Sequence, residues 1–238
     1  YGDDYFLEDY EFILSLMMFE TRILDSDDLL VEWYKDGELF YSSMDSLILS
    51  DMLSTGSATY RAEMTLNGAS YSTEEFEIKT VPGVVYVSNS GDDSNDGKTP
   101  ETAKRSLDVL LREFPYGKPY VINAISNVSD SGEKNSVFTI NGMYDIPDGV
   151  TLNIGDNCVV KFSDNAGLNV LSGGTLNVGN SVVFPPIAAD SIGGDTNADE
   201  GRSLPQYDKY TISGSGNIAI AEDCDWRYKS FEYGGTLE

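Results

Sequence analysis

The chain has 238 residues, of which 40% are hydrophobic and 11% aromatic, and it carries a formal net charge of −25 at pH 7. So acidic a surface repels the phosphate backbone, which excludes a nucleic-acid-binding role, and the apolar content is too high for a disordered protein. The chain has no histidine, which excludes serine–histidine catalysis and histidine metal sites. Its two cysteines are too few for a disulfide framework. It contains no run of 18 apolar residues, so the sequence does not predict a membrane span.

Residues 1–82 have the pattern of a β-sandwich. Short stretches rich in β-branched and aromatic residues alternate with turn signals, about every 8–12 residues. Asp36-Gly37 and Asn67-Gly68 stand between apolar runs and predict hairpin turns. The expected strands are residues 10–19, 30–34, 46–49, 56–65 and 71–78.

Two aromatic residues add detail to this sandwich. Trp33 lies in the second expected strand, and Tyr60 precedes Ala62 by two residues in the fourth. This arrangement resembles an immunoglobulin-like domain, with Trp33 as the central-strand tryptophan, Tyr60 as the tyrosine corner and Ala62 in place of the second cysteine. Many bacterial immunoglobulin-like domains lack the cysteines in the same way. The resemblance implies that Trp33 packs in the core instead of stacking on a ligand.

Residues 81–83 are the expected linker, and a Tyr-Val-Ser strand follows it. Next come a turn rich in glycine and aspartate at residues 91–97 and a Thr-Pro helix start, with Thr99 as the N-cap. Residues 106–114 continue the helix with apolar residues on one face. This segment resembles the opening of pectate-lyase-like right-handed β-helix proteins. The resemblance implies a helix that caps the open end of a solenoid, where core and strand edges are otherwise exposed.

A repeat with an offset of 24 residues (173 − 149) organises the C-terminal part. Residues 149–155 read Gly-Val-Thr-Leu-Asn-Ile-Gly, and residues 173–179 read Gly-Gly-Thr-Leu-Asn-Val-Gly. Residues 218–224 fit as a third copy once an inserted loop is allowed for. Short strands at such a period are typical of a solenoid. We therefore expect an all-β chain in which an immunoglobulin-like β-sandwich (1–82) is followed by a right-handed parallel β-helix with a short N-terminal capping helix (83–238).

The repeat also predicts which side chains stack, because residues of a strand alternate between the two faces. Residues 137–140 and 144–146 are expected to form the first coil. Cys158, Val182 and Cys224 fall in one ladder, with Val182 between the two cysteines. Neighbouring coils lie about 4.8 Å apart. Two such spacings exceed the roughly 7 Å between Cα atoms that a disulfide can bridge. We expect two free, buried thiols. The expected inward ladders are Leu152, Leu176 and Ile218, and Ile154, Val178 and Ile220.

Two acidic loops place oxygen ligands at alternating positions, which is the pattern of a calcium loop. The first occupies residues 92–97, and a hydrogen-bonded Asx turn explains it equally well. The second lies in an acidic loop inserted at residues 185–211, where the alternative is a solvated surface loop. With Ca²⁺ as the cation, the predicted ligands are Asp92 and Asp96 in the first loop and Asp195, Asn197 and Asp199 in the second.

The β-helix resemblance implies polysaccharide lyases and glycoside hydrolases among the relatives. Three or four coils are fewer than a catalytic groove of these families normally needs, and fold alone does not give function. An ordinary outward-facing solenoid side chain is the alternative for every catalytic candidate. The candidate bases are Lys161, Arg227 and Lys229, and the candidate acids are Asp223 and Asp225.

The leading prediction is a fragment of a secreted or cell-surface adhesin or binding protein, directed at a glycan or a host surface. The alternatives are the non-catalytic N-terminal part of a carbohydrate-active enzyme and a structural stalk. We expect an extracellular or cell-surface location, a carbohydrate or surface-protein ligand, and association through the open end of the β-helix, whose last coil has an unpaired edge. The tyrosines expected to stack on sugar rings are Tyr207, Tyr210, Tyr228 and Tyr233.

Overall fold

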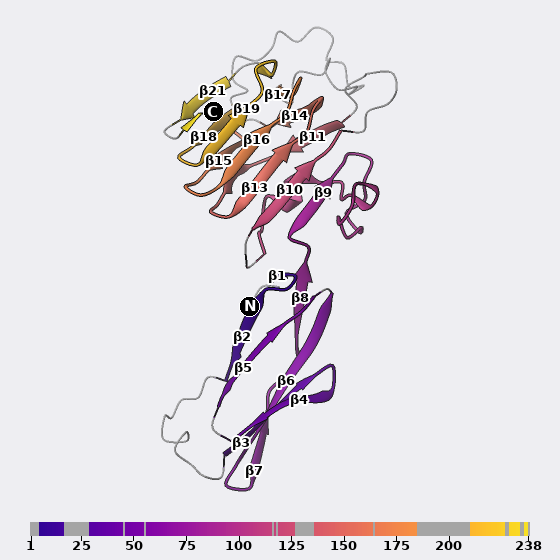
Figure 1. Ribbon diagram of the computed structural model, residues 1–238, viewed down its shortest axis with the longest axis vertical. Coiled ribbons are helices and arrows are strands. Elements are labelled where there is room, and N and C mark those ends of the chain that lie inside the picture. The colour runs from indigo at the N-terminus through magenta and orange to yellow at the C-terminus, as the bar shows by residue number, and fades with distance from the viewer. Residues whose placement is uncertain are drawn as a thin grey trace. The chain divides into compact units, whose positions relative to one another are not determined.

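The structure is a computed structural model of the chain. It describes residues 5–16, 29–44, 46–54, 56–115, 117, 119–126, 136–163, 165–184, 210–226, 229–233 and 236–237, and the side chains of Tyr5, Tyr210 and residues 225–237 are outside the description. The fold is all-β (Figure 1). The chain divides into two compact units, Tyr1–Val81 with Pro115–Gly117 and Pro82–Phe114 with Lys118–Glu238.

The first unit contains two sheets. The larger has the strand order β1-β8-β6-β3-β4, with β7 also paired to β6, and the smaller pairs β2 with β5. All pairs are antiparallel except β1 with β8, which is parallel. The strands are β1 (Tyr5–Leu7), β2 (Glu11–Ser15), β3 (Leu29–Lys35), β4 (Glu38–Ser43), β5 (Ile48–Met52), β6 (Ser57–Leu66), β7 (Ala69–Ser72) and β8 (Phe76–Val81).

Both predicted hairpin turns are present. Asp36 and Gly37 join β3 to β4, and Asn67 and Gly68 join β6 to β7. All four residues have positive φ angles, of 50°, 81°, 49° and 79° in chain order. Two consecutive positive φ values match the twist of antiparallel strands, and Asn, Asp and Gly adopt them at the lowest cost.

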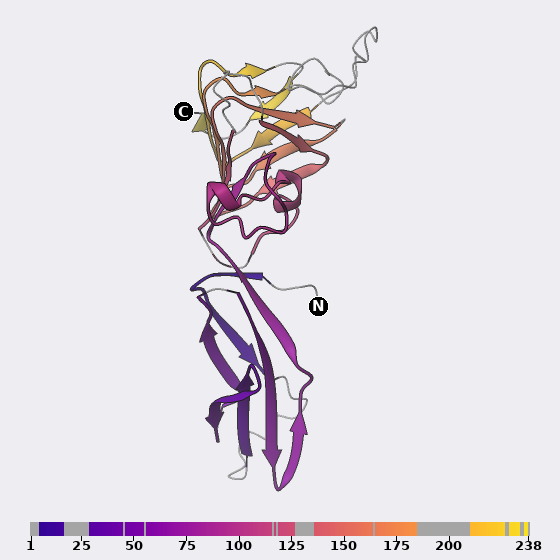
Figure 2. The ribbon, with the colours of Figure 1, turned by 90° about the vertical axis from the view of Figure 1, so that its right-hand side faces the viewer.

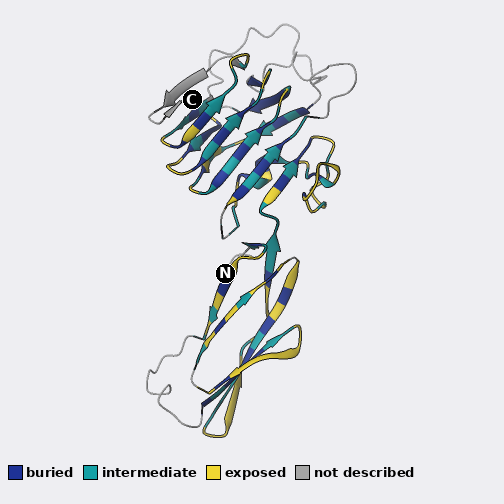
Figure 3. Ribbon diagram, viewed as in Figure 1, coloured by how far each residue is buried: buried dark blue, intermediate teal, exposed yellow. Residues whose placement is uncertain are grey.

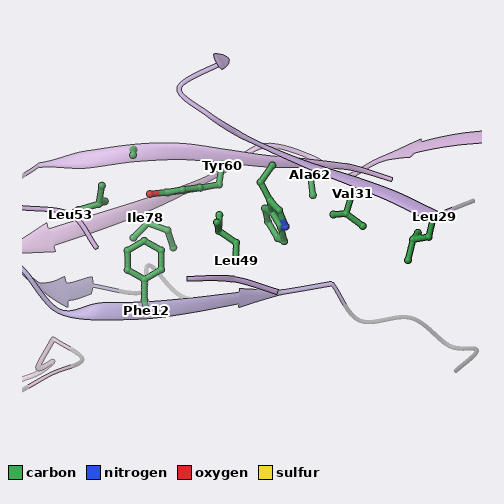
Figure 4. Packing of buried hydrophobic residues seen from close by; sticks show 10 residues of the cluster. Phe12, Leu29, Val31, Leu49, Leu53, Tyr60, Ala62 and Ile78 are labelled. Carbon is green, nitrogen blue, oxygen red and sulfur yellow. The ribbon is translucent and has the colours of Figure 1, made fainter. Parts of the chain in front are cut away.

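A hydrophobic core lies between these two sheets. Figure 4 shows Val31, Tyr60 and Ala62 of the larger sheet facing Phe12 of the smaller. The Trp33 side chain is 1% exposed, and Trp33 is the cross-strand partner of Ala62, so the expectation that it packs in the core is confirmed. Burial of one such large side chain stabilises the fold by roughly 1.5–3 kcal/mol.

The second unit is built from three parallel sheets that the chain visits in turn (Figures 1 and 2). The first sheet has the order β22-β19-β16-β13-β10-β9, the second β11-β14-β17-β20 and the third β12-β15-β18-β21. Each circuit of the chain therefore adds one strand to each sheet. The strands are β9 (Val84–Val87), β10 (Tyr120–Ala124), β11 (Ser136–Ile140), β12 (Met143–Ile146), β13 (Val150–Ile154), β14 (Cys158–Phe162), β15 (Gly167–Val170), β16 (Thr175–Val178), β17 (Val183–Phe184), β18 (Tyr210–Gly214), β19 (Asn217–Ile220), β20 (Asp225–Trp226), β21 (Lys229–Tyr233) and β22 (Thr236–Leu237).

The register of the first parallel sheet agrees with the predicted ladders. Leu152 pairs with Leu176 and Leu176 with Ile218, and the corresponding row joins Ile154, Val178 and Ile220. Figure 3 shows the resulting alternation of buried and partly exposed residues along these strands. Of the predicted inserted loop, 185–211, residues 185–209 lie outside the described part of the chain, and residues 210 and 211 belong to β18.

Neither of the two cysteines forms a disulfide, as predicted. Val159 pairs with Val183 and Val183 with Asp225, so the positions just before them, including Cys158 and Cys224, share one row. Cys158 is buried, whereas Cys224 is only half-buried, which corrects the expectation of two buried thiols. Cys224 is more exposed because it directly precedes β20, which in the described chain is the terminal strand of the second sheet.

The expectation of one helix running from Thr99 to residue 114 is wrong. Pro100–Thr102 forms a single 3₁₀ turn. Thr99 is its N-cap, as predicted, and Thr99 and Thr102 also form a capping box. A separate four-residue helix, α1, spans Leu107–Leu110. In the part of the chain that the structure describes, no helix has the length and hydropathy needed to cross a membrane.

The helix is interrupted because the chain between the two turns pairs with β9. The backbone N–H of Lys104 donates to the Tyr86 carbonyl at 2.9 Å, and the Lys104 carbonyl accepts from the Ser88 N–H at 2.8 Å. Leu107 and Leu111 then cover the core, with side chains 2% exposed. The capping segment therefore covers both the core and the backbone edge of β9, and these bonds compete with helix formation.

Candidate functional site

The outward positions of the first parallel sheet are uncharged across five neighbouring strands. Their alternation with fully buried residues makes them the solvent side of the sheet. We call these ten residues the neutral face. One row consists of Val84, Val121, Thr151, Thr175 and Asn217, and the other of Tyr86, Asn123, Asn153, Asn177 and Ala219.

An amide ladder runs through the second row of the neutral face. The Asn153 Nδ2 donates to Asn123 Oδ1 at 2.8 Å, and the Asn177 Nδ2 donates to Asn153 Oδ1 at 2.8 Å. A side-chain amide has two N–H groups and an oxygen with two lone pairs. Each ladder amide is therefore held in one orientation and can still donate at least one and accept at least one further hydrogen bond.

Hydroxyl and aromatic groups complete the neutral face. Thr151 and Thr175 are paired neighbours in the first row, and both are half-buried. Tyr86 stands at the β9 end of the amide row. With strands roughly 4.8 Å apart, the face presents hydrogen-bonding groups at a spacing close to the length of one hexose unit. Such a surface can bind a polar, uncharged, extended ligand.

The sequence also contains a signal for this face. Thr-Leu-Asn recurs at residues 151–153 and 175–177, with leucine at the buried position. A buried position explains why leucine is repeated, but packing in the interior of the second unit does not require identical outward residues. Repeated outward Thr and Asn therefore indicate either the ladder, a ligand or both.

The predicted calcium ligands of the first loop act as turn acceptors. Asp92 Oδ1 accepts from the Ser94 N–H at 2.9 Å and from the Ser94 hydroxyl at 2.7 Å, and Asp96 Oδ1 accepts from the Lys98 N–H at 3.0 Å. The N–H of Ser94 lowers the pKa of Asp92, and the N–H of Lys98 lowers that of Asp96. Both carboxylates are therefore charged at neutral pH and already bonded.

The adjacent Asp93, which the calcium pattern does not include, has the most extensive contacts of this loop. Its Oδ1 accepts from the N–H groups of Arg105 (3.0 Å) and Ser106 (2.8 Å), and its Oδ2 accepts from the Ser106 hydroxyl at 2.6 Å. Burial opposes ionisation, but the bonds from Ser106 and Arg105 outweigh it and lower the pKa of Asp93. Asp93 thus ties the turn to the start of α1.

Metal binding in these loops stays a prediction. Within the described residues, no cluster of three or more Asp, Glu, Cys or His side chains is arranged to hold a metal ion. The second predicted set, Asp195, Asn197 and Asp199, lies outside the described residues.

The structure also locates some of the catalytic candidates. Lys161 occupies an outward register position in β14, but its side chain is 4% exposed, so the expected solvent-facing base is wrong. All five residues of β14 are buried, so this strand is covered on both faces. Asp223 accepts from the Ser181 N–H at 2.8 Å and from the Ser181 hydroxyl at 2.6 Å. The side chains of Arg227, Lys229 and Asp225, and those of the four tyrosines expected to bind sugars, lie outside the description.

A cleft of about 380 Å³ lies between α1 and β11. Asp108 forms part of its wall, and its Oδ1 accepts from the Asn141 N–H at 2.8 Å and from the Tyr144 hydroxyl at 2.9 Å. Its Oδ2 accepts from Arg112 at 2.5 Å. Burial opposes ionisation of Asp108, but these donors outweigh it and lower its pKa. Asp108 therefore accepts three hydrogen bonds and fixes α1 to the segment that links β11 and β12.

Comparison of the chain with protein-family models, with curated proteins and with solved structures returned no match.

Proposed function

We propose that this chain is a non-catalytic binding module of a secreted or cell-surface protein, and that the neutral face binds an uncharged glycan. One observation carries the proposal: ten outward residues over five strands carry no charge, although the chain has a net charge of −25. Charged residues, which keep such a surface solvated, are the expected occupants of outward strand positions. The absence of charged residues from these outward positions indicates that this face of the sheet contacts an uncharged ligand.

The architecture that supports this reading is an immunoglobulin-like sandwich followed by a capped, right-handed parallel β-helix. The pairing of Trp33 with Ala62 and the burial of Tyr60 support the first assignment. The circuit through three parallel sheets supports the second. Modular chains of this kind occur in proteins that bind surfaces outside the cell.

The chemistry of the neutral face suits sugar hydroxyls. Threonine hydroxyls and asparagine amides both donate and accept, and the Tyr86 ring offers a flat surface for a pyranose. Each hydrogen bond exchanged with water contributes about 0.5–1.5 kcal/mol net. A single sugar therefore binds weakly, and affinity grows with the number of strands that an extended glycan crosses.

The test is a glycan array followed by calorimetry on the neutral glycans that bind. Thr175→Lys adds a long charged side chain to the centre of the face, and Thr211→Lys makes the same change on the outer side of the third sheet. We expect Thr175→Lys to weaken binding at least tenfold and Thr211→Lys to leave it unchanged. Absence of any neutral glycan ligand, or equal loss in both variants, would contradict the proposal.

A further inference from the structure

The two rows of the neutral face differ in how their polar groups are engaged. In the second row the amide ladder holds Asn123, Asn153 and Asn177 in one orientation. In the first row Thr151 and Thr175 are half-buried, and within the described residues their hydroxyls have no hydrogen-bond partner. A ligand can therefore bond to these two hydroxyls without displacing any bond of the described chain.

The strand register fixes the spacing of these groups. Thr151 is paired with Thr175 and Asn153 with Asn177, so like groups recur once per strand, about 4.8 Å apart. The two rows are separated by two residues along each strand, which is roughly 6.6 Å. The polar groups therefore form a regular array whose long axis crosses the strands. A ligand that bonds to several strands at once must be straight and must repeat at nearly the same interval.

The linkage between sugars decides whether a glycan can follow this line. Pyranoses that are joined by equatorial bonds at opposite ends of each ring form a straight ribbon, which advances by nearly one ring length per sugar. An axial bond at one of these positions turns the chain into a coil, whose successive sugars rise away from a flat sheet. Successive sugars of the ribbon are turned over, so each row meets hydroxyls of alternating kind. Threonine hydroxyls and asparagine amides both donate and accept, so either row can bond either edge of the ribbon.

We propose that the neutral face selects neutral glycans with equatorial linkages at both ends of each ring, and that such a chain lies across the strands with one sugar over each strand. The proposal rests on the proposed function, because it names the class of glycan that the same face binds. The subsites over β13 and β16 are the strongest, since each of these strands presents both a hydroxyl and an amide. The subsites over β10 and β19 are weaker, because β10 contributes only Asn123 and β19 only Asn217.

The probes are four series of neutral oligosaccharides, from the disaccharide to the hexasaccharide, titrated into the intact chain by isothermal calorimetry. Cello-, xylo- and manno-oligosaccharides have equatorial linkages and differ in their other hydroxyls. Malto-oligosaccharides contain the same glucose as the cello series, but their anomeric bond is axial. They are therefore the matched control for linkage.

We expect at least one of the three equatorially linked series to gain roughly twofold to tenfold in affinity with each added sugar, which is the range that one hydrogen bond supplies. The gain should end once the strands of the neutral face are occupied. Malto-oligosaccharides of equal length should bind at least about tenfold more weakly, because the coil brings few of their sugars to the sheet.

Two variants test whether the sugars follow the strands. Asn217→Lys places a charge at the β19 end of the face, so affinity should level off at a shorter oligosaccharide while the trisaccharide binds as before. Thr175→Lys places the same side chain over β16 and should weaken the trisaccharide and the longer oligosaccharides at least about tenfold. Thr211→Lys on the third sheet is the control, and melting curves confirm that each variant is folded.

The outcomes separate this inference from the proposed function. If malto-oligosaccharides bind as tightly as the equatorially linked series and Thr175→Lys removes both, the face binds glycans but does not select straight ones. Affinity that stays constant beyond the disaccharide would show a single compact site in place of a row of subsites. If none of the four series binds while the array yields another neutral glycan, the inference fails and the proposed function stands. If the array yields no neutral glycan either, both fail.

Discussion

The Tyr60 hydroxyl donates a hydrogen bond to Asp51 Oδ2 at 2.5 Å, and this bond joins the two sheets of the first unit. The Lys35 ammonium donates to the same oxygen at 2.7 Å. Burial raises the pKa of Tyr60, and the Asp51 carboxylate raises it further. Burial opposes ionisation of Asp51, but the bonds from Lys35 and Tyr60 outweigh it and lower its pKa. The three residues form one polar link at the rim of the core.

Removing the hydroxyl should weaken the first unit. A hydrogen bond to a charged group contributes about 1.5–3 kcal/mol, so Tyr60→Phe should lower the free energy of unfolding by about that amount. The matched control is Tyr71→Phe, because Tyr71 is 59% exposed. Differential scanning calorimetry would show the change. Equal unfolding transitions for the two variants would mean that the link is not stabilising.

The stability of the first unit should depend on pH at both ends of the scale. Folding lowers the pKa of Asp51. Its contribution to the free energy of unfolding is therefore complete at pH values above the pKa of an ordinary carboxyl group, and it is lost as the pH falls through the folded-state pKa. The pKa of Tyr60 is raised on folding, so its contribution is complete below about pH 10 and is lost at higher pH. Melting temperatures measured from pH 2 to pH 11 should show both losses, and Asp51→Asn should flatten the acid limb.

Asp108 should matter to the second unit in a similar way. Asp108→Asn removes the charge that three donors hold, and we expect a loss of about 1–3 kcal/mol in the free energy of unfolding. Asp145→Asn is the control, because exposed Asp145 accepts one bond, from Asn169, and an amide oxygen can still accept it. Urea unfolding of both variants, followed by circular dichroism, would compare them directly.

The amide ladder should respond unequally to substitution along its length. Asn153 takes part in two ladder bonds and Asn177 in one. Asn153→Ala should therefore cost roughly twice as much stability as Asn177→Ala, with each bond contributing about 0.5–1.5 kcal/mol. Hydrogen exchange at the backbone amides of β13 and β16 would report the difference. Equal costs for the two substitutions would argue against a connected ladder.

The two thiols should be chemically distinct. Burial, with help from Asp156, raises the pKa of Cys158 to about 12, so it stays protonated and unreactive in the folded chain. Cys224 is half-buried. A thiol reagent should therefore modify one cysteine before denaturation and two after it, and Cys224→Ser should leave none reactive in the folded chain. Rapid modification of both thiols in the folded protein would contradict the packing of β14.

The sequence predicted the strand register of the first parallel sheet well, because the 24-residue repeat is visible in individual residues. Leu152 and Leu176 fill the same interior position, so the repeat carried both the period and the register. It missed β10, whose Tyr-Val-Ile-Asn-Ala lacks the repeated glycine and threonine but aligns Asn123 with Asn153. Local signals also predicted Thr99 as an N-cap.

Long-range contacts account for what the sequence could not predict. The helix ended early because Lys104 pairs with β9, a contact that helix propensity does not encode. The neutral face was missed because hydrophobic periodicity identifies inward residues and is silent about outward ones.

The bridge between Lys104 and Val87 has a consequence for how the second unit assembles. It closes the backbone of β9 on the side away from β10, so within this sheet new strands are added in one direction. Between β13 and β16, each new strand meets a partner 24 residues earlier in the chain, a short loop to close. The second unit can therefore fold during synthesis, starting from the capped end. Each completed circuit then provides the strand edges on which the next circuit pairs.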